Sequence, residues 1–270
     1  MNIVELPARH YRLFNFEGTP NDEHHLGYEE AILPLPVEET ALVLVDTWND
    51  HPTEGWVKRA VRCMEEKIVP LLEAVRKTNI TVIHAPSKHV AVYYPQWIRY
   101  ASDEDLDLVP PPAERPEPQW PPAEFRNREG KYAIFKHRRP ENLVRPTGIY
   151  KPVEPLPHEY VVGTREQMHR LLTHQKLLYL VYAGFASNMC LQDKPCAIKA
   201  MSGLGYVCIV LSDCGIAYES HDTVDEELQH KVAIRDIEAE MGWSSTLEEF
   251  LGALKAHMKA GDPAPRDEAI

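Results

Sequence analysis

Five short apolar runs punctuate the chain, at residues 41–45, 81–85, 132–135, 177–183 and 206–211. Each run is nearly continuous rather than alternating, which is typical of strands that are covered on both faces. A polar residue, a glycine or a proline ends each run, so the strands are expected to be short. The pattern therefore predicts five buried strands.

Longer stretches outside these runs carry apolar residues at helical spacing. They predict helices over 56–79, 164–175, 224–240 and 246–258, and Pro70 is expected to kink or divide the first of them. Strands that alternate with helices form parallel sheets that are covered by helices. The predicted fold is therefore α/β: a three-layer αβα domain with a Rossmann-like parallel sheet and helices on both faces.

A chain of 270 residues is long enough for one large domain with a full core. We expect an N-terminal extension over 1–38 that is draped over the domain, the α/β domain itself over 39–260, and a frayed tail over 261–270. The proline-rich part of residues 90–130 cannot form a helix or a central strand. It is predicted to be an insertion that leaves the sheet, of the kind that serves as a lid or an interface arm.

Charge and composition exclude several classes of protein. The formal net charge is −12 at pH 7, which argues against nucleic acid or an anionic membrane surface as a partner. No apolar run approaches the length of a membrane span, and the N-terminus lacks the apolar segment of a signal peptide. The five cysteines show no metal-binding spacing, so we expect reduced thiols in a cytoplasmic protein.

Three chemically active residues follow predicted strands: Asp46, Lys136 and Cys190. The carboxyl ends of parallel strands lie along one edge of a sheet, so these residues are expected to converge there. Ser187 and Asn188 offer N-cap side chains for a helix whose first turn would hold Cys190 and lower the pKa of its thiol. A thiolate can attack a carbonyl carbon, a carboxylate can carry protons, and an ammonium group can stabilise negative charge. Taken singly, each residue also has an ordinary interpretation: a buried cysteine, a helix cap and a solvated charge.

Three motifs around these residues resemble those of the isochorismatase-like cysteine hydrolases, the superfamily of nicotinamidase and N-carbamoylsarcosine amidohydrolase. Residues 42–51, LVLVDTWNDH, are similar to the family's apolar strand followed by D-x-Q-N-D-F, with two substitutions. The segment AIFK at 133–136 matches the lysine motif, and GFASNMC at 184–190 matches G-x-A-T-N-x-C with serine in place of threonine. The resemblance covers about residues 40–215.

The resemblance implies an enzyme: a cysteine-dependent hydrolase that cleaves a C–N bond of a small amide, ureide or carbamoyl compound. Cys190 would form a thioester, Asp46 would act as acid and base, and Lys136 would support them. A cis Phe185–Ala186 peptide is also implied, with an oxyanion hole formed by the backbone N–H groups of Ala186 and Cys190. The expected partner is a small-molecule substrate, without a cofactor, in a homo-oligomer. Two alternatives stay open: vinyl ether hydrolysis of the isochorismatase type, and a catalytically idle interaction module on the same fold.

Outside these motifs, the chain departs from the family pattern at two further places. Three residues, 193–195, are inserted after the cysteine motif, and a helix that restarts there would make Cys196 a rival nucleophile. The metal-binding D-x-H of nicotinamidases is absent after the second strand, where His84 and His89 form only a pair of candidate ligands. We therefore predict a site without a metal.

Side chains near the three motifs are candidates for the substrate pocket. An aromatic wall against a planar amide is one interpretation of the tryptophans and His51, and ordinary core packing is the other. Arg138 and Arg139 are candidates for binding a substrate carboxylate, although surface charge explains them as well. The predicted pocket residues are Trp48, Asn49, His51, Trp56, His84, His89 and His137.

Overall fold

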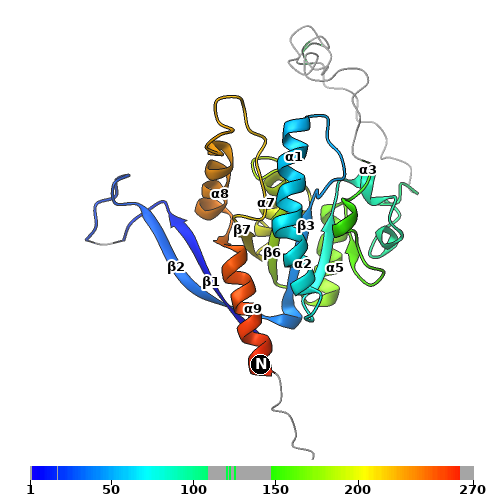
Figure 1. The fold of residues 1–270 in the computed structure, drawn as a ribbon, viewed down its shortest axis with the longest axis horizontal. Helices are drawn as coiled ribbons and strands as arrows, with labels where there is room; N and C mark the ends of the chain where they lie inside the picture. The colour runs from blue at the N-terminus through cyan, green and yellow to red at the C-terminus, as the bar shows by residue number, and fades with distance from the viewer. Residues whose placement is uncertain are drawn as a thin grey trace, which may run out of the picture.

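A computed structural model describes residues 2–16, 18–108, 120, 122, 125 and 147–261. At its centre lies an eight-stranded sheet in the order β2-β1-β8-β7-β6-β3-β4-β5 (Figure 1). The strands are β1 (Ile3–Arg12), β2 (Gly27–Pro36), β3 (Thr40–Val45), β4 (Thr81–Ala85), β5 (Tyr160–Val161), β6 (Tyr179–Gly184), β7 (Val207–Leu211) and β8 (Trp243–Ser245). Neighbours from β8 to β5 pair in parallel, whereas β1 is antiparallel to both β2 and β8. The predicted parallel sheet of an α/β fold is confirmed.

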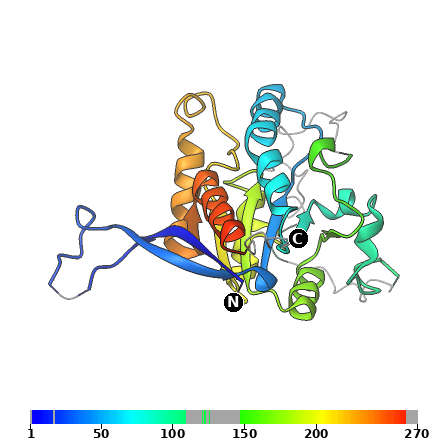
Figure 2. The same cartoon turned by 60° about the horizontal axis from the view of Figure 1, so that its bottom comes forward.

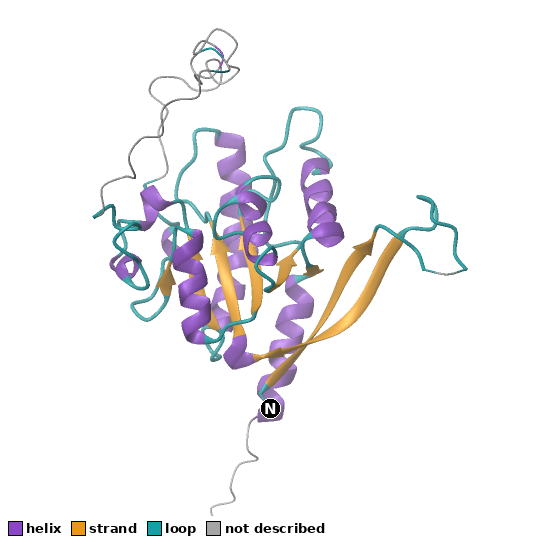
Figure 3. Cartoon of the chain, turned by 180° about the vertical axis from the view of Figure 1, so that it is seen from behind, coloured by secondary structure: helices purple, strands orange, loops and turns teal. Residues whose placement is uncertain are grey.

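Helices cover both faces of this sheet (Figures 1 and 3). Leu42 and Leu44 of β3 pack with one set of helices, and Val43 between them packs with the other set. Successive side chains of a strand point to opposite faces, so this alternation builds three layers. The first set is α1 (Glu54–Cys63), α2 (Val69–Val75) and α9 (Leu247–Gly261); the second is α5 (Arg165–Gln175), α7 (Ile198–Ser202) and α8 (Leu228–Glu240). Shorter helices are α3 (Lys88–Ala91), α6 (Cys190–Asp193), η1 (Val37–Glu39), η3 (Pro95–Ile98) and η5 (Lys151–Val153).

The first predicted helix is one helical stretch with a π-helical segment in its middle. α1 leads into η2, the π-helical segment Met64–Ile68, and α2 follows directly. Pro70 stands in the first turn of α2, and its missing N–H disturbs the hydrogen bonds just before it. The disturbance predicted at Pro70 is therefore present, and it takes the form of a π-helical turn.

The N-terminal segment differs from the draped extension predicted for residues 1–38. β1 and β2 form a long antiparallel hairpin that adds two strands to the sheet, and its far end projects from the body of the molecule (Figure 2). Val4, Leu6 and Ala8 are buried, whereas the residues between them are more exposed. This alternation is typical of a strand with one covered face, so the hairpin follows from a pattern that the sequence contains.

The strand and lysine motif predicted at 132–136 lie outside the described residues. β4 is flanked by β5, where Tyr160 and Val161 pair with Ile83 and His84. β5 and β8 have two and three residues, which is too short for a hydrophobic pattern to reveal. Within the described ranges, no helix combines the length and the apolar composition that crossing a bilayer requires.

Candidate active site

The candidate site lies where β3 and β6 end side by side. Val45 and Gly184, the last residues of the two strands, are register partners. Asp46 follows the first strand directly, and the cysteine loop, residues 185–189, leads from the second strand into α6 at Cys190. Asp46 is fully buried and Cys190 is half-buried. The structure thus brings two of the three predicted catalytic residues to one edge of the sheet, while Lys136 lies outside the described residues.

Gly184 lets the two strand ends come this close. Its φ is +123°, and a Cβ built on it would lie 2.0 Å from the Val45 carbonyl oxygen. The Phe185 N–H donates to that same oxygen at 2.9 Å, which holds the start of the cysteine loop against β3. A side chain at position 184 would therefore push the loop away from Asp46.

Gly184→Ala is expected to lower the free energy of unfolding by about 3 kcal/mol or more, since it combines an unfavourable φ with a backbone clash. Gly205→Ala is the matched control, because its φ is +94° but no described atom lies within 4 Å of the added Cβ. The control is expected to lose about 1 kcal/mol. Urea denaturation of both variants measures the difference, and equal losses would contradict the importance of the close approach.

Two polar side chains of the cysteine loop do not cap α6, contrary to the prediction. Asn188 Oδ1 accepts from the Tyr218 N–H at 2.9 Å, and its Nδ2 donates to the Tyr218 carbonyl oxygen at 3.2 Å. His230 Nε2 donates to the Ser212 carbonyl oxygen at 2.8 Å, which leaves Nδ1 as an acceptor. Ser187 Oγ donates to this Nδ1 at 2.8 Å. The side chains that were predicted as caps instead fix the loop to its neighbours, including His230 of α8, which the sequence analysis did not single out.

The backbone of the cysteine loop turns sharply before Cys190. The Phe185–Ala186 peptide is cis. The Ala186 carbonyl oxygen accepts from the N–H groups of Met189 at 3.0 Å and Leu191 at 3.1 Å. The Ala186 N–H lies close enough to the Cys190 sulfur to favour the thiolate and so lower the thiol pKa. One of the two predicted oxyanion donors is therefore next to the sulfur.

Asp46 binds a lysine that the sequence analysis did not single out. Lys194 Nζ donates to Asp46 Oδ1 at 2.6 Å and to the Ala85 carbonyl oxygen at 3.2 Å. Ser87 Oγ lies 3.4 Å from the same carboxylate oxygen. The other oxygen, Oδ2, is buried and has no hydrogen-bond partner among the described residues. Oδ2 is thus available to take a proton, and the insertion at 193–195 was the signal in the sequence that could have pointed to Lys194.

The Cys190 thiol lies between opposing charges. Burial and the negative charge of Asp46 raise its pKa to about 12, while Lys194 and the Ala186 N–H act in the opposite direction. The lowered pKa predicted from a helix N-terminus is therefore reversed, because α6 is a single turn, and because burial and the Asp46 carboxylate both disfavour the thiolate. At neutral pH the resting thiol keeps its proton, so its activation requires a neighbouring base.

Cys196, the rival nucleophile, is 2% exposed and lies between α6 and α7. Its Sγ donates to the Thr164 carbonyl oxygen at 3.1 Å. Burial raises the pKa of this thiol to about 12. The helix restarts at Ile198 rather than before Cys196, so the side chain faces the core and not a site open to a substrate.

Three predicted pocket residues form an aromatic cluster beside the cysteine loop. The ring centroids of Trp48 and His51 are 6.0 Å apart and those of His51 and Trp56 are 4.5 Å apart. Tyr218 lies 5.8 Å from His51, and Phe185 of the cysteine loop lies 5.7 Å from Trp56. The indole nitrogens of both tryptophans are buried without a hydrogen-bond partner in the described part of the chain. Trp56 and Tyr218 also line a cavity of about 280 Å³.

The remaining predicted pocket residues do not join this cluster. Asn49 Oδ1 accepts from the Gly148 N–H at 3.2 Å, so Asn49 holds the segment that begins at residue 147 against the loop after β3. His84 is fully buried and its Nε2 is 2.9 Å from Glu159 Oε2, which corrects the prediction that it lines the pocket. Burial lowers the pKa of His84, against the opposing effect of Glu159. His89 is exposed on α3, and His137 lies outside the described residues, as do Arg138 and Arg139.

The structure does not join His84 and His89 in a metal site. Across the described ranges, no group of three His, Cys, Asp or Glu side chains is arranged to hold a metal ion. His84 Nε2 instead contacts Oε2 of Glu159. The other carboxylate oxygen of Glu159 accepts from Arg76 Nε at 2.7 Å. This buried cluster links β4 to α2 and to the segment before β5.

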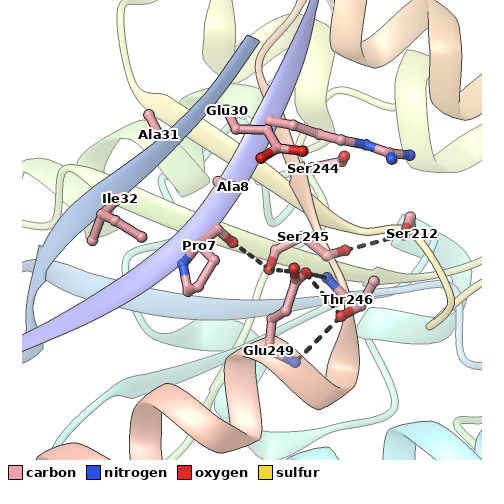
Figure 4. A pocket seen from close by; sticks show the side chains of 11 residues that line it. Pro7, Ala8, Glu30, Ala31, Ile32, Ser212, Ser244, Ser245, Thr246 and Glu249 are labelled. Atoms are coloured by element: carbon pink, nitrogen blue, oxygen red, sulfur yellow. Dashed lines mark hydrogen bonds between the residues drawn. The ribbon is translucent and has the colours of Figure 1, made fainter. Parts of the chain in front are cut away.

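A larger cavity, of about 450 Å³, lies where the hairpin leaves the sheet (Figure 4). Ser245 Oγ donates to the Pro7 carbonyl oxygen at 2.7 Å, and Ser212 Oγ donates to the Ser245 carbonyl oxygen at 3.1 Å. None of the predicted catalytic or pocket residues that the structure describes lines this cavity. The lining residues are Pro7, Ala8, Arg9, Glu30, Ala31, Ile32, Ser212, Ser244, Ser245, Thr246 and Glu249.

Several solved structures are similar to this chain. A cysteine hydrolase from Pseudomonas syringae pv. phaseolicola 1448A is 15% identical, and the match covers 83% of this chain and 96% of that protein with a TM-score of 0.53. An isochorismatase family protein from Burkholderia thailandensis is 17% identical over 81% of this chain and 96% of that one, with a TM-score of 0.47. The nicotinamidase from Staphylococcus aureus is 11% identical over 75% of this chain and 96% of that one, with a TM-score of 0.42.

No protein-family model and no curated protein matches the chain. At 15% identity, the similarity to the Pseudomonas protein establishes the fold. The chain therefore shares its fold with a cysteine hydrolase, as the resemblance of its sequence motifs predicts.

Proposed function

We propose that the protein is a cysteine-dependent hydrolase that cleaves a C–N bond of a small amide, ureide or carbamoyl compound. The observation that carries the proposal is a half-buried thiol, Cys190, beside a fully buried carboxylate, Asp46, whose Oδ2 has no described partner. A purely structural thiol gains nothing from a neighbouring carboxylate, which raises its pKa. A nucleophile that must lose its proton during attack needs such a base.

The proposed reaction begins when the Cys190 sulfur adds to the carbonyl carbon and its proton passes to Asp46 Oδ2. Negative charge moves to the carbonyl oxygen, where the backbone N–H groups of Ala186 and Cys190 stabilise it. The C–N bond then breaks, and Asp46 returns the proton to the leaving nitrogen. Ammonia or an amine departs, and a thioester remains on Cys190.

Water completes the cycle. Asp46, again a carboxylate, takes a proton from the water molecule that attacks the thioester carbon. The C–S bond breaks, and the proton returns to the Cys190 sulfur. One water molecule is consumed, and both residues regain their starting protonation states.

The aromatic cluster supports a planar substrate. Trp48, His51 and Trp56 offer ring faces, and Phe185 connects the cluster to the cysteine loop. The two buried indole N–H groups without described partners favour a substrate that carries hydrogen-bond acceptors. Burial lowers the pKa of His51, with Asp50 opposing, so the neutral ring is the favoured form. A planar carboxamide or ureide has both properties, flat faces and acceptor oxygens.

A panel of small amides, ureides and carbamoyl compounds, assayed for ammonia or amine release, tests this function. At least one planar member of the panel is expected to be hydrolysed, with a thioester on Cys190 that acid quenching traps for mass spectrometry. An isochorismate-type vinyl ether is the matched alternative substrate. Hydrolysis of the ether, with every C–N compound left intact, would contradict the proposal.

Activity is expected to be unaffected by removal of divalent metal ions. The proposed oxyanion donors are backbone N–H groups, and the chain lacks a D-x-H sequence after β4. The measurement is ammonia release before and after exhaustive dialysis against a chelator, with added zinc, iron or manganese as separate arms. Loss of activity that one of these metals restores would refute the expectation.

A further inference from the structure

A cation beside the candidate nucleophile comes from the insertion that follows it. Lys194 Nζ lies 2.6 Å from Asp46 Oδ1 and 3.2 Å from the Ala85 carbonyl oxygen. We propose that Lys194 is a positioning residue of the reaction: it fixes the Asp46 carboxylate and supplies the positive charge that supports the thiolate. This inference rests on the proposed function, and it gives the inserted segment the role that the resemblance assigned to Lys136.

The chain delivers Lys194 from the end of α6. Its N–H donates to the Cys190 carbonyl oxygen at 3.3 Å, so it stands one turn after the nucleophile. Its backbone is extended, with φ −65° and ψ 157°, as is usual for a residue before a proline. Pro195 thus ends the helix at this point, and α7 begins only at Ile198. The Lys194 side chain reaches the carboxyl ends of β3 and β4, where its two acceptors lie.

Burial explains why Asp46 needs this partner. The Asp46 side chain is 0% exposed and that of Lys194 is 13% exposed. A buried carboxylate without a counter-charge is strongly unfavourable. Within the described part of the chain, Lys194 is the one cation in ion-pair contact with Asp46. The ion pair leaves Oδ2 free of described partners, so the carboxylate keeps one oxygen for the thiol proton.

The positive charge of Lys194 stabilises the negative charge both before and after the proton passes from Cys190 to Asp46. Before attack, its positive charge faces the Asp46 carboxylate. When the proton passes from Cys190 to Asp46, the negative charge passes to the sulfur, and Lys194 still lies beside it. Among the described residues, the charged and polar groups that act on the thiol are Asp46, Lys194 and the Ala186 N–H, and the last two favour the thiolate. An ion pair that served stability alone would leave the reactivity of the thiol unchanged.

Alkylation of Cys190 in the absence of substrate distinguishes a positioning role of Lys194 from a purely structural one. Iodoacetamide reacts with the thiolate, so its rate below the thiol pKa follows the thiolate fraction. Lys194→Met keeps the length of the side chain but removes the charge, and it is expected to slow alkylation about tenfold at each pH tested, since it raises the thiol pKa by about one unit. Lys194→Arg is expected to restore most of the rate. Lys199→Met is the matched control, because Lys199 is 67% exposed and pairs only loosely with Asp193, at 3.6 Å.

Lys194→Met leaves the Asp46 carboxylate buried without this partner, so the variant can misfold. A second pair of variants makes the same comparison without that carboxylate. Asp46→Asn and the double variant Asp46→Asn with Lys194→Met both lack that carboxylate. Alkylation of Cys190 is expected to be about tenfold slower in the double variant, because the two proteins differ only in the cation. Equal rates in this pair would overturn the assignment.

Activity measurements distinguish failure of the Lys194 proposal from failure of the proposed hydrolase function. In Lys194→Met, kcat on an amide is expected to fall about tenfold or more with little change in KM, because the charge acts on the reacting groups and not on substrate binding. Full turnover in Lys194→Met, together with a loss of alkylation rate in Lys136→Met, would overturn the role of Lys194 and return it to Lys136. A third outcome would overturn the proposed function alone. In it, Cys190 is alkylated faster in the wild-type protein than in Lys194→Met, but the wild-type protein hydrolyses no C–N compound.

Discussion

Replacement of Cys190 by alanine is expected to abolish turnover, with a fall in kcat of at least about 10³-fold. The substitution removes the sulfur of the proposed thioester, and none of the other four cysteines lies beside Asp46 in the position of Cys190. The protein should stay folded, because the side chain is only half-buried and the backbone N–H groups of the loop are untouched. Steady-state assays of amide hydrolysis measure the loss of turnover. Thermal melting, monitored by circular dichroism, measures whether the fold is retained.

Cys196→Ala is the matched control for this substitution. Cys196 is buried and bonded to the Thr164 carbonyl oxygen, so its loss is expected to cost about 1 kcal/mol of stability and to leave kcat unchanged. Retained turnover in Cys190→Ala would contradict the proposed mechanism. So would an inactive but folded Cys196→Ala.

Asp46→Asn is expected to lower kcat by about 10²–10⁴-fold, since an amide can neither accept the thiol proton nor return it to the leaving nitrogen. Alkylation of Cys190 is expected to change in the opposite direction. The negative charge of Asp46 raises the thiol pKa, whereas Lys194 lowers it and is retained in this variant. The thiolate fraction at neutral pH should therefore rise, and iodoacetamide should react faster.

The pair of opposite changes distinguishes a base from a merely structural carboxylate. Amide turnover and iodoacetamide labelling are measured on the same preparation, with wild-type protein and Asp50→Asn as references. Asp50 is exposed and accepts from the His51 N–H, so its replacement should leave both rates near those of the wild type. Turnover by Asp46→Asn at the wild-type rate would remove Asp46 from the mechanism.

The sequence was sufficient to predict the centre of the sheet and the two residues that meet there. β3 and β6 are continuous apolar runs, and Asp46 and the cysteine loop follow them at the points where strand ends converge. Gly184 carries a further constraint, since only glycine fits against the Val45 carbonyl oxygen. These features depend on local pattern and on the geometry common to parallel sheets, which is why they could be predicted.

Features that depend on where a loop travels could not be predicted in the same way. Lys194 is a loop lysine, and such residues are usually solvated; its contact with Asp46 depends on the path of the chain between α6 and α7. From the sequence, His84 is a candidate for a metal site, for the pocket or for a local hydrogen bond, and it is included among the predicted pocket residues. Its true partner, Glu159, comes from the segment before the two-residue strand β5, and no periodicity marks it.

Brief treatment of the native protein with iodoacetamide, followed by peptide mass spectrometry, tests the central claim most directly. Cys190 and Cys63 are half-buried, whereas Cys196, Cys208 and Cys214 are buried. Burial and Asp213 raise the pKa of Cys63 to about 12, against the opposing effect of Lys67, and no proposed role requires it to react. Cys190 is expected to carry the first label, because it faces the site and because Lys194 and the Ala186 N–H favour its thiolate. A first label on Cys196 or Cys63, with Cys190 unmodified, would contradict this claim.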